Sequence, residues 1–95
     1  MRYRLSVAAK EDLRRIYRHG FYTFGEVQAD KYFLNLTERF QQIADSSHLY
    51  PIADEIDTKL RKSLCGVDVI YYELTDTGVF IVRILGRQSR ETSFL

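Results

Sequence analysis

Apolar residues at helical spacing in the middle of the chain constrain its fold more than any other sequence feature. From position 29 to position 44 they recur every three or four residues, as Ala29, Tyr32, Phe33, Leu36, Phe40, Ile43 and Ala44. This spacing places them along one face of an amphipathic helix. The sequence therefore predicts a helix from near Gly25 to Asp45, with the side chains of Tyr32, Phe33, Leu36 and Phe40 in the core.

A shorter helix is predicted just before this one, ending between Gly20 and Thr23. One of its faces carries Leu13, Ile16, Tyr17 and Gly20, and the opposite face carries the cations Lys10, Arg14, Arg15 and Arg18. Ser6 is a residue type that caps helix N-termini. Because only Phe24-Gly25-Glu26 separates the two amphipathic helices, we expect them to form an antiparallel helical hairpin.

Extended segments lie on both sides of the predicted hairpin. Residues 2–5 alternate between polar and apolar, and after the loop at Pro51 come three further strands, at Leu60–Leu64, Val67–Leu74 and Val79–Leu85. Residues 75–78 form a hairpin turn that ends in glycine. The order β-α-α-β-β-β predicts an α+β domain, with the helical hairpin on one face of a small, mostly antiparallel sheet. At 95 residues, the chain is expected to be one domain over residues 1–95.

The last predicted strand contains a single charged residue, Arg83. Arginine is rarely fully buried without a partner, so we expect this strand to end in a cleft or to face a ligand. Arg87, Gln88 and Arg90 follow Gly86 and could bind carboxylate, phosphate or backbone groups. If the last three strands pair in order, Arg61 and Arg83 are expected on the same face of the sheet.

Charge is distributed unevenly, although the net charge is only +1. Residues 1–20 carry a net charge of +4, residues 21–58 carry −5 and residues 59–95 carry +2. If the two basic ends meet in the fold, one face would be basic and would attract an acidic partner. The alternative is that these mixed charges serve only solubility.

Patterns of catalytic and metal-binding residues are scarce. The two histidines, His19 and His48, do not combine with Cys65 in any spacing typical of a metal site, and the glycines are scattered. We therefore predict no catalytic residue, no metal ligand and no cofactor. One cysteine, no secretory leader and no apolar run of membrane length favour a cytoplasmic protein without membrane association.

Four short patterns occur in order along the chain: Tyr3–Ser6 with Asp12-Leu13, Phe24-Gly25 with Gln28-Ala29 and Tyr32, Leu60-Arg61 with Gly66 and Val69–Tyr72, and Val79 with Ile81–Gln88. With these patterns the sequence resembles the ParE-type toxins of the RelE/ParE superfamily, found in bacterial type II toxin–antitoxin systems. The resemblance covers nearly the whole chain. One departure is Ser89, which stands where many relatives have an acidic residue.

The resemblance implies a choice between two activities. RelE-type members cleave mRNA on the ribosome with several Lys or Arg residues and a C-terminal Tyr or His, whereas ParE-type members inhibit DNA gyrase. Arg61 and Arg83 match the basic positions that both branches share, but no Tyr or His follows Arg83. Because a ribonuclease of this design needs a proton donor, the sequence favours the gyrase-directed branch.

The resemblance therefore implies a toxin that binds DNA gyrase and is neutralised by a ParD-like antitoxin, with no sequence-specific binding to nucleic acid. Candidate residues for gyrase inhibition are Arg61, Arg83, Arg87, Gln88, Arg90, Phe94 and Leu95. Candidate residues for antitoxin contact are Arg14, Arg18, Tyr17 and Phe21. The alternatives are a RelE-like, ribosome-dependent endoribonuclease and a non-toxic module for protein interaction.

Overall fold

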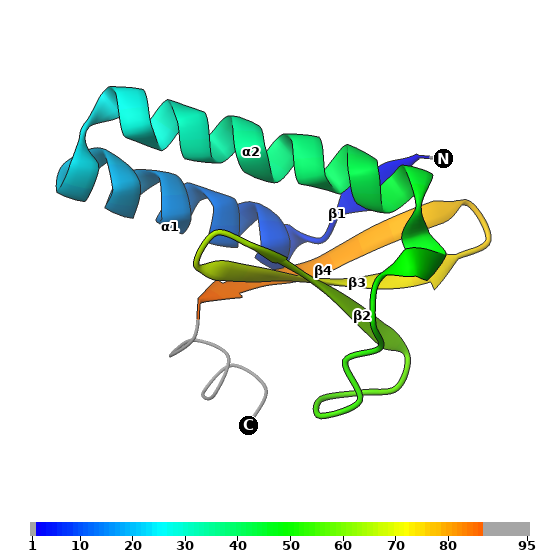
Figure 1. Ribbon diagram of the computed structural model, residues 1–95. Helices are drawn as coiled ribbons and strands as arrows, with labels where there is room; N and C mark the ends of the chain where they lie inside the picture. Colours follow the sequence, from blue (N-terminus) through cyan, green and yellow to red (C-terminus); the bar gives the residue numbers. More distant parts are fainter. Residues whose placement is uncertain (1, 87–95) are drawn as a thin grey trace.

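The computed structural model describes residues 2–86, which form two helices packed on one face of a four-stranded sheet (Figure 1). The elements in order are β1 (Tyr3–Leu5), α1 (Val7–Phe24), α2 (Glu26–Asp45), the short 3-10 helix η1 (Ser47–Leu49), β2 (Leu60–Cys65), β3 (Asp68–Thr75) and β4 (Gly78–Gly86). The predicted α+β fold and its order β-α-α-β-β-β are confirmed. Boundaries differ from the predictions by one to a few residues, mainly because α1 continues to Phe24.

Local side-chain and backbone chemistry explains where α1 begins and where the hairpin turns. The Ser6 hydroxyl accepts a hydrogen bond from the Ala9 amide at 2.9 Å, which confirms the predicted N-cap. Gly25 separates the helices with a φ of 94°, a conformation that suits glycine. No helix in residues 2–86 combines the length and apolar character needed to cross a membrane.

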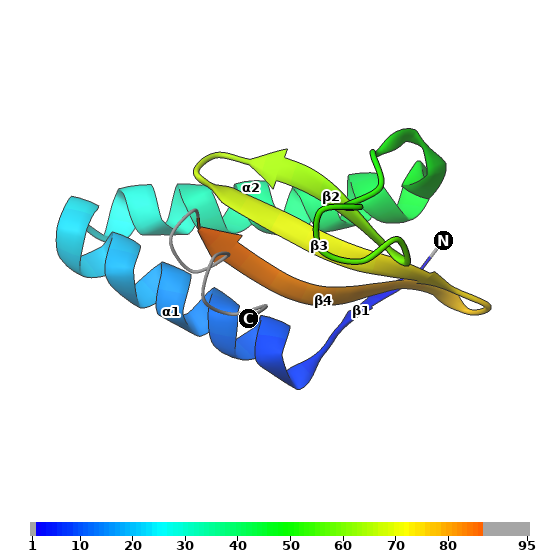
Figure 2. The same cartoon turned by 90° about the horizontal axis from the view of Figure 1, so that it is seen from below.

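The sheet has the strand order β1-β4-β3-β2 and is mixed (Figure 2). The pairs β2–β3 and β3–β4 are antiparallel, whereas β1 lies parallel to β4 with Tyr3 opposite Val79 and Leu5 opposite Ile81. The prediction of a mostly antiparallel sheet is thus confirmed. The parallel pair places residues from the two ends of the described chain side by side.

The core lies mainly between the helical hairpin and the sheet. It includes Leu36 and Phe40 from α2 and Tyr72, Ile81 and Ile84 from the sheet. A smaller cluster on the other face, which includes Val69, Tyr71 and Leu85, is partly covered by Ala53 and Ile56. Both faces of β3 are therefore buried.

Phe33 is an exception to the predicted core, since 39% of it is exposed. Its ring packs at 90° to that of Tyr17, with ring centroids 6.1 Å apart, on the outer side of the hairpin. The sheet-facing stripe of α2 is narrower than the sequence pattern implies, because Leu36, Phe40 and Ile43 fill the space above the sheet. Tyr32 is only partly buried, although it packs against the core.

Candidate functional site

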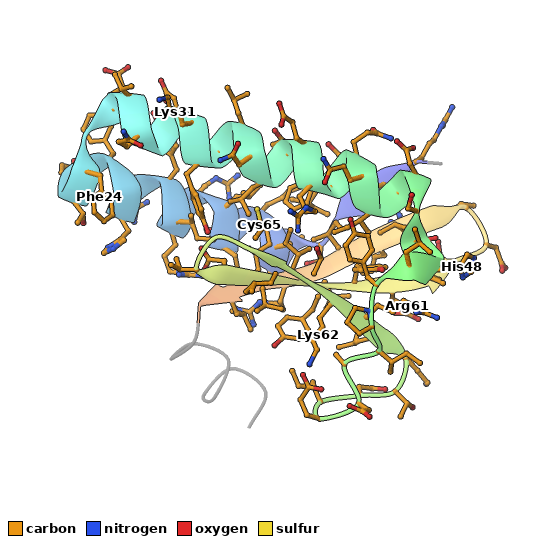
Figure 3. All side chains as sticks on the ribbon, in the orientation of Figure 1. Phe24, Lys31, His48, Arg61, Lys62 and Cys65 are labelled. Atoms are coloured by element: carbon orange, nitrogen blue, oxygen red, sulfur yellow. The ribbon has the colours of Figure 1, made fainter. Side chains whose placement is uncertain are left out.

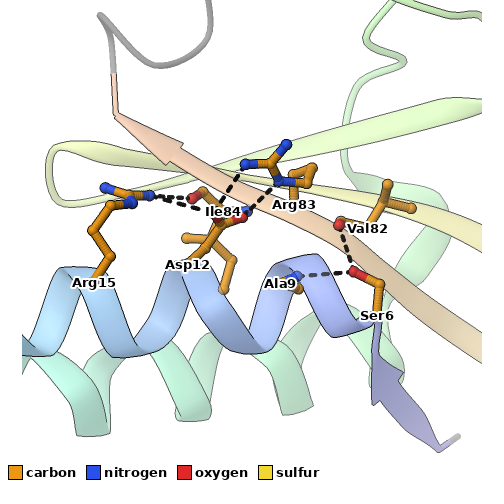
Figure 4. Close-up of polar contacts among 7 residues, drawn as sticks. All are labelled: Ser6, Ala9, Asp12, Arg15, Val82, Arg83 and Ile84. Atoms are coloured by element: carbon orange, nitrogen blue, oxygen red, sulfur yellow. Dashed lines mark hydrogen bonds and ion pairs between the residues drawn. The ribbon is translucent and has the colours of Figure 1, made fainter. Parts of the chain in front are cut away.

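Beyond the short strand β1, the outer edge of β4 is covered by polar groups from the start of α1 and its first turns (Figure 4). The amide of Ser6 donates to the carbonyl of Ile81, and its hydroxyl donates to the carbonyl of Val82 at 2.7 Å. Further along the strand, the Ile84 amide donates to Asp12 at 2.9 Å. The Arg15 guanidinium donates to the Ile84 carbonyl at 3.2 Å. These contacts close an edge that would otherwise offer backbone groups for pairing.

Asp12 also binds Arg83 through two hydrogen bonds. Nε of Arg83 donates to Oδ2 of Asp12 at 2.8 Å, and Nη2 donates to Oδ1 at 3.0 Å. Asp12 is only 4% exposed, and the side chain of Arg83 is 27% exposed. The sequence predicts that this strand ends in a cleft or faces a ligand, and the partner that the structure provides for Arg83 itself is a carboxylate of the same chain.

Both members of this pair are held in their charged forms. Burial raises the pKa of Asp12, but hydrogen bonds from Arg83 and Ile84 and the charges of Arg83 and Arg15 outweigh burial, so the pKa lies below its usual value. The hydrogen bond with Asp12 raises the pKa of Arg83. The pair therefore acts as a neutral unit that joins α1 to β4.

A bulge in β4 lies beside the ion pair. Tyr71 pairs with Arg83 and Tyr72 pairs with Ile81, so Val82 has no partner in β3. Such an extra residue redirects the side chains next to it. We attribute the reach of Arg83 toward α1 to this bulge.

Arg61 lies elsewhere on the sheet. It pairs with Tyr72, whereas Arg83 pairs with Tyr71, and consecutive strand residues point to opposite faces. The prediction that Arg61 and Arg83 share a face is therefore wrong. Arg61 donates to the carbonyl of Tyr50 at 2.7 Å, at the end of the molecule that also carries His48 (Figure 3).

The remaining candidates for gyrase inhibition cannot be placed in the fold. Arg87, Gln88, Arg90, Phe94 and Leu95 all lie outside the described residues. In the sequence they follow Gly86, the last residue of β4.

The four candidates for antitoxin contact come together on the outer side of the hairpin. They line an open groove of about 580 Å³ whose walls are Lys10, Leu13, Arg14, Tyr17, Arg18, Phe21, Tyr22 and Phe33. The Tyr17 hydroxyl donates to Asp30 of α2 at 2.7 Å, and Arg14 pairs with Glu11. We call this surface the outer groove; it combines aromatic rings with positive charge.

A second groove, which the sequence analysis does not predict, lies between the hairpin and the end of the sheet. It measures about 640 Å³ and is mainly apolar, with Phe24, Gln28, Ala29, Val67 and Gly86 among its lining residues. We call it the inner groove. The sequence signal that could have indicated it is Phe24, a large apolar residue in the predicted break between the two helices.

Tyr32 forms one wall of the inner groove and fixes the turn between β2 and β3. Its hydroxyl lies 2.8 Å from both the Asp68 carboxylate and the Cys65 carbonyl, and it accepts a hydrogen bond from the Val67 amide. Burial, with the hydrogen bond to Asp68, raises the pKa of Tyr32, so the phenol stays neutral. Gly66 lies beneath the ring with a φ of 60°, where an added Cβ would come within 2.4 Å of Tyr32 Cε1.

Two features of the described residues bear on metal binding and on nucleophilic chemistry. No group of three or more His, Cys, Asp or Glu side chains in residues 2–86 could hold a metal ion. Burial raises the pKa of the Cys65 thiol, which disfavours the nucleophilic thiolate. The outer groove, the inner groove and the cations along α1 are among the accessible features of the described residues.

Comparison with known proteins identified a matching family and similar solved structures. The family described as "ParE toxin of type II toxin-antitoxin system, parDE" matches residues 3–90. A solved structure, described as the chromosomal ParDE TA system from P. aeruginosa, has a TM-score of 0.79 at 18% sequence identity. That match covers 90% of this chain and 95% of the other, and it shows a common fold. No curated protein sequence matches the chain.

Proposed function

This chain belongs to the ParE toxin family of type II toxin–antitoxin systems, and we propose that it acts by binding and inhibiting DNA gyrase, without catalysis. We place the action of the protein in the cytoplasm, where gyrase works on DNA. A ParD-like antitoxin neutralises it. The protein needs no cofactor for this activity.

The main support is the absence of an acid–base residue beyond the last strand, since no Tyr or His follows Arg83 in the sequence. A ribonuclease of the related branch needs such a group to protonate the leaving oxygen. The internal contacts of the two shared basic residues add to this support. Arg61 binds a backbone carbonyl and Arg83 binds Asp12, so neither guanidinium is fully available to a phosphate.

We assign the contact with gyrase to residues near the end of β4 and beyond it. Arg87, Gln88 and Arg90 offer a group of guanidinium and amide donors, and Phe94 and Leu95 offer apolar contact. Arg83 supports this region by holding β4 against α1, and Arg61 is a more distant candidate. The aromatic and basic outer groove supports a separate role for Arg14, Arg18, Tyr17 and Phe21 in contact with an acidic antitoxin segment.

A supercoiling assay with purified gyrase tests the activity. We expect the protein to inhibit supercoiling or to trap cleaved DNA, and to leave mRNA intact in ribosome complexes. Cleavage of mRNA with gyrase unaffected would establish the endoribonuclease alternative. A protein inactive in both assays and harmless on induction would be an interaction module.

A combined substitution tests the assignment of residues. The full chain with Arg87, Gln88 and Arg90 all changed to Ala should lose most gyrase inhibition, whereas single changes should weaken it less, because peripheral charges act mainly on association rate. Lys59→Ala is a control that removes one exposed cation elsewhere. Full inhibition by the triple variant would move the contact site to another surface.

A further inference from the structure

The outer groove combines a row of cations with a row of apolar and aromatic side chains. The cations recur every four residues along α1, as Lys10, Arg14 and Arg18. The second row repeats this spacing, as Leu13, Tyr17 and Phe21. Residues four apart on a helix share one face and lie about 6 Å apart along the axis, so the two rows run side by side. Among the described residues that line the groove, none carries a carboxylate.

The acidic residues of α1 do not cancel this positive charge. Asp12 points toward the sheet, where it is paired with the guanidinium in β4 (Figure 4). Glu11 is exposed and pairs with Arg14. Lys10 and Arg18 form no ion pair with any other described residue. Since the net charge of the whole chain is only +1, attraction of an anion to the groove depends on this local excess of cations.

Aromatic rings form a continuous series of contacts along the groove. Phe33 meets Tyr17 at 90°, with ring centroids 6.1 Å apart. Tyr17 contacts Phe21 at 6.3 Å, and Phe21 meets Tyr22 at 5.4 Å. The Tyr17 hydroxyl donates to Asp30 at 2.7 Å, which fixes the ring in the middle of the series. Tyr22, at the end of the series, is 80% exposed, so its ring is open to a planar ligand.

Cations beside exposed rings match the two parts of a single nucleic-acid strand. Its phosphates attract a row of cations, and its unpaired bases stack on aromatic side chains. In a duplex the bases are already stacked on one another, so only the phosphates would find partners in the groove. An acidic peptide would pair with the cations but has no planar bases for the exposed rings. The surface therefore fits a single strand better than a duplex or an acidic peptide.

We propose that the outer groove binds single-stranded nucleic acid without sequence preference. The phosphates contact Lys10, Arg14 and Arg18, and a base stacks on Tyr22. This activity goes beyond the proposed inhibition of gyrase and would give the protein a contact with DNA itself. A strand and the acidic antitoxin segment assigned above to the same groove are both negatively charged, so each would exclude the other.

Binding of labelled strands to the full-length protein, measured by fluorescence anisotropy, tests the inference. The probes are oligo(dT) and oligo(rU) of about 16 nucleotides, long enough for one site, and a DNA duplex of the same length. We expect a single strand to bind more tightly than the duplex. The plot of log affinity against log salt should have a slope of about −2, as three phosphate contacts require. The tighter of the two single strands identifies DNA or RNA as the preferred ligand.

Variants separate stacking from charge. Tyr22→Ala and Tyr22→Leu should each weaken binding of the strand at least about fivefold, whereas Tyr22→Phe keeps the ring and should change it less than about twofold. Arg18→Ala should make the salt slope shallower by about 0.7, which corresponds to one phosphate contact. Lys31→Ala is the matched control, because Lys31 is an exposed cation on α2 that does not line the groove (Figure 3). It should leave the slope unchanged.

Several results would overturn the inference. They are failure of both single strands to bind at low salt, binding of the duplex as tightly as the single strand, and equal affinity of Tyr22→Leu and the unchanged protein. Tighter binding of a glutamate-rich peptide than of either strand would assign the groove to an acidic protein segment instead. The assay contains neither gyrase nor antitoxin, so its result stands whether or not the protein inhibits gyrase.

Discussion

The two helices hold the sheet with different chemistry. On α1, the ionised Asp12 binds the Arg83 guanidinium and the Ile84 amide. On α2, the neutral hydroxyl of Tyr32 binds Asp68 and the backbone of the β2–β3 turn. Both side chains place a polar group against the sheet and satisfy backbone groups there. The difference teaches that the group supplied by α1 is a charged carboxylate, which acid neutralises, whereas the group supplied by α2 is a hydroxyl that stays neutral.

The largest effect is expected from Asp12→Ala. It leaves the guanidinium of Arg83 and the amide of Ile84 without their partner, and removal of one member of a buried pair costs roughly 3 kcal/mol or more. Chemical denaturation should show this loss. Glu11→Ala is the matched control, because Glu11 pairs with Arg14 on the exposed side and should contribute less than about 1 kcal/mol. Equal stability of the two variants would mean that Asp12 does not hold α1 to β4.

A smaller loss is expected from Tyr32→Phe. The variant keeps the ring but leaves Asp68, which is 5% exposed, without the donated hydrogen bond, at a cost of about 2 kcal/mol. Tyr22→Phe, at a position that is 80% exposed, is the control. A greater loss for Tyr32→Phe than for Asp12→Ala would reverse the ranking of the two contacts.

The two side chains that the helices supply, Asp12 and Tyr32, respond to opposite extremes of pH. The pKa of Asp12 is lowered by folding, so its contribution to stability is complete above the ordinary value of 3.8 and is lost as pH falls through the lower folded value. The pKa of Tyr32 is raised, so its contribution is complete below the ordinary value of 10.0 and is lost only in strong alkali. Denaturation curves between pH 5 and pH 2, compared with those of Asp12→Asn, should show a smaller pH dependence in the variant.

The smallest effect on stability is expected on the outer face of α1. Arg18→Ala should change the free energy of unfolding by less than about 0.5 kcal/mol, because Arg18 is exposed. Its effect should instead appear in antitoxin binding, measured by titration calorimetry at low and high salt. Unchanged binding at both salt concentrations would remove Arg18 from the proposed contact.

The sequence predicted the elements well because their signals are local. Ser6 as N-cap, the helical spacing from Ala29 to Ala44 and the turn before Gly78 each depend on residues within a few positions of one another. The separation of Tyr71 and Tyr72 to opposite faces of β3 follows from strand alternation alone.

The site was less predictable because it depends on contacts between distant positions. Asp12 has the same helical spacing as Ala9 and Ile16, so an acid on the apolar face of α1 could have been matched to Arg83, the one cation in an apolar strand. No sequence pattern indicates the bulge at Val82. Without knowledge of the bulge, the sheet faces on which Arg61 and Arg83 lie could not be derived. Phe33 fits the helical pattern of the core equally well whether it faces the sheet or Tyr17.

The parallel pairing of β1 with β4 has a consequence for how the protein is made. The hydrogen bond from Ser6 to Val82 joins positions 76 residues apart, so β1 waits for its neighbour until almost all of the described chain has been synthesised. The helical hairpin and the β2–β3 hairpin can form early, because their contacts are local, whereas long-range pairing comes late and slowly. Translation itself therefore delays the native sheet, and a nascent chain does not present the finished end of β4 until Gly86 has been synthesised.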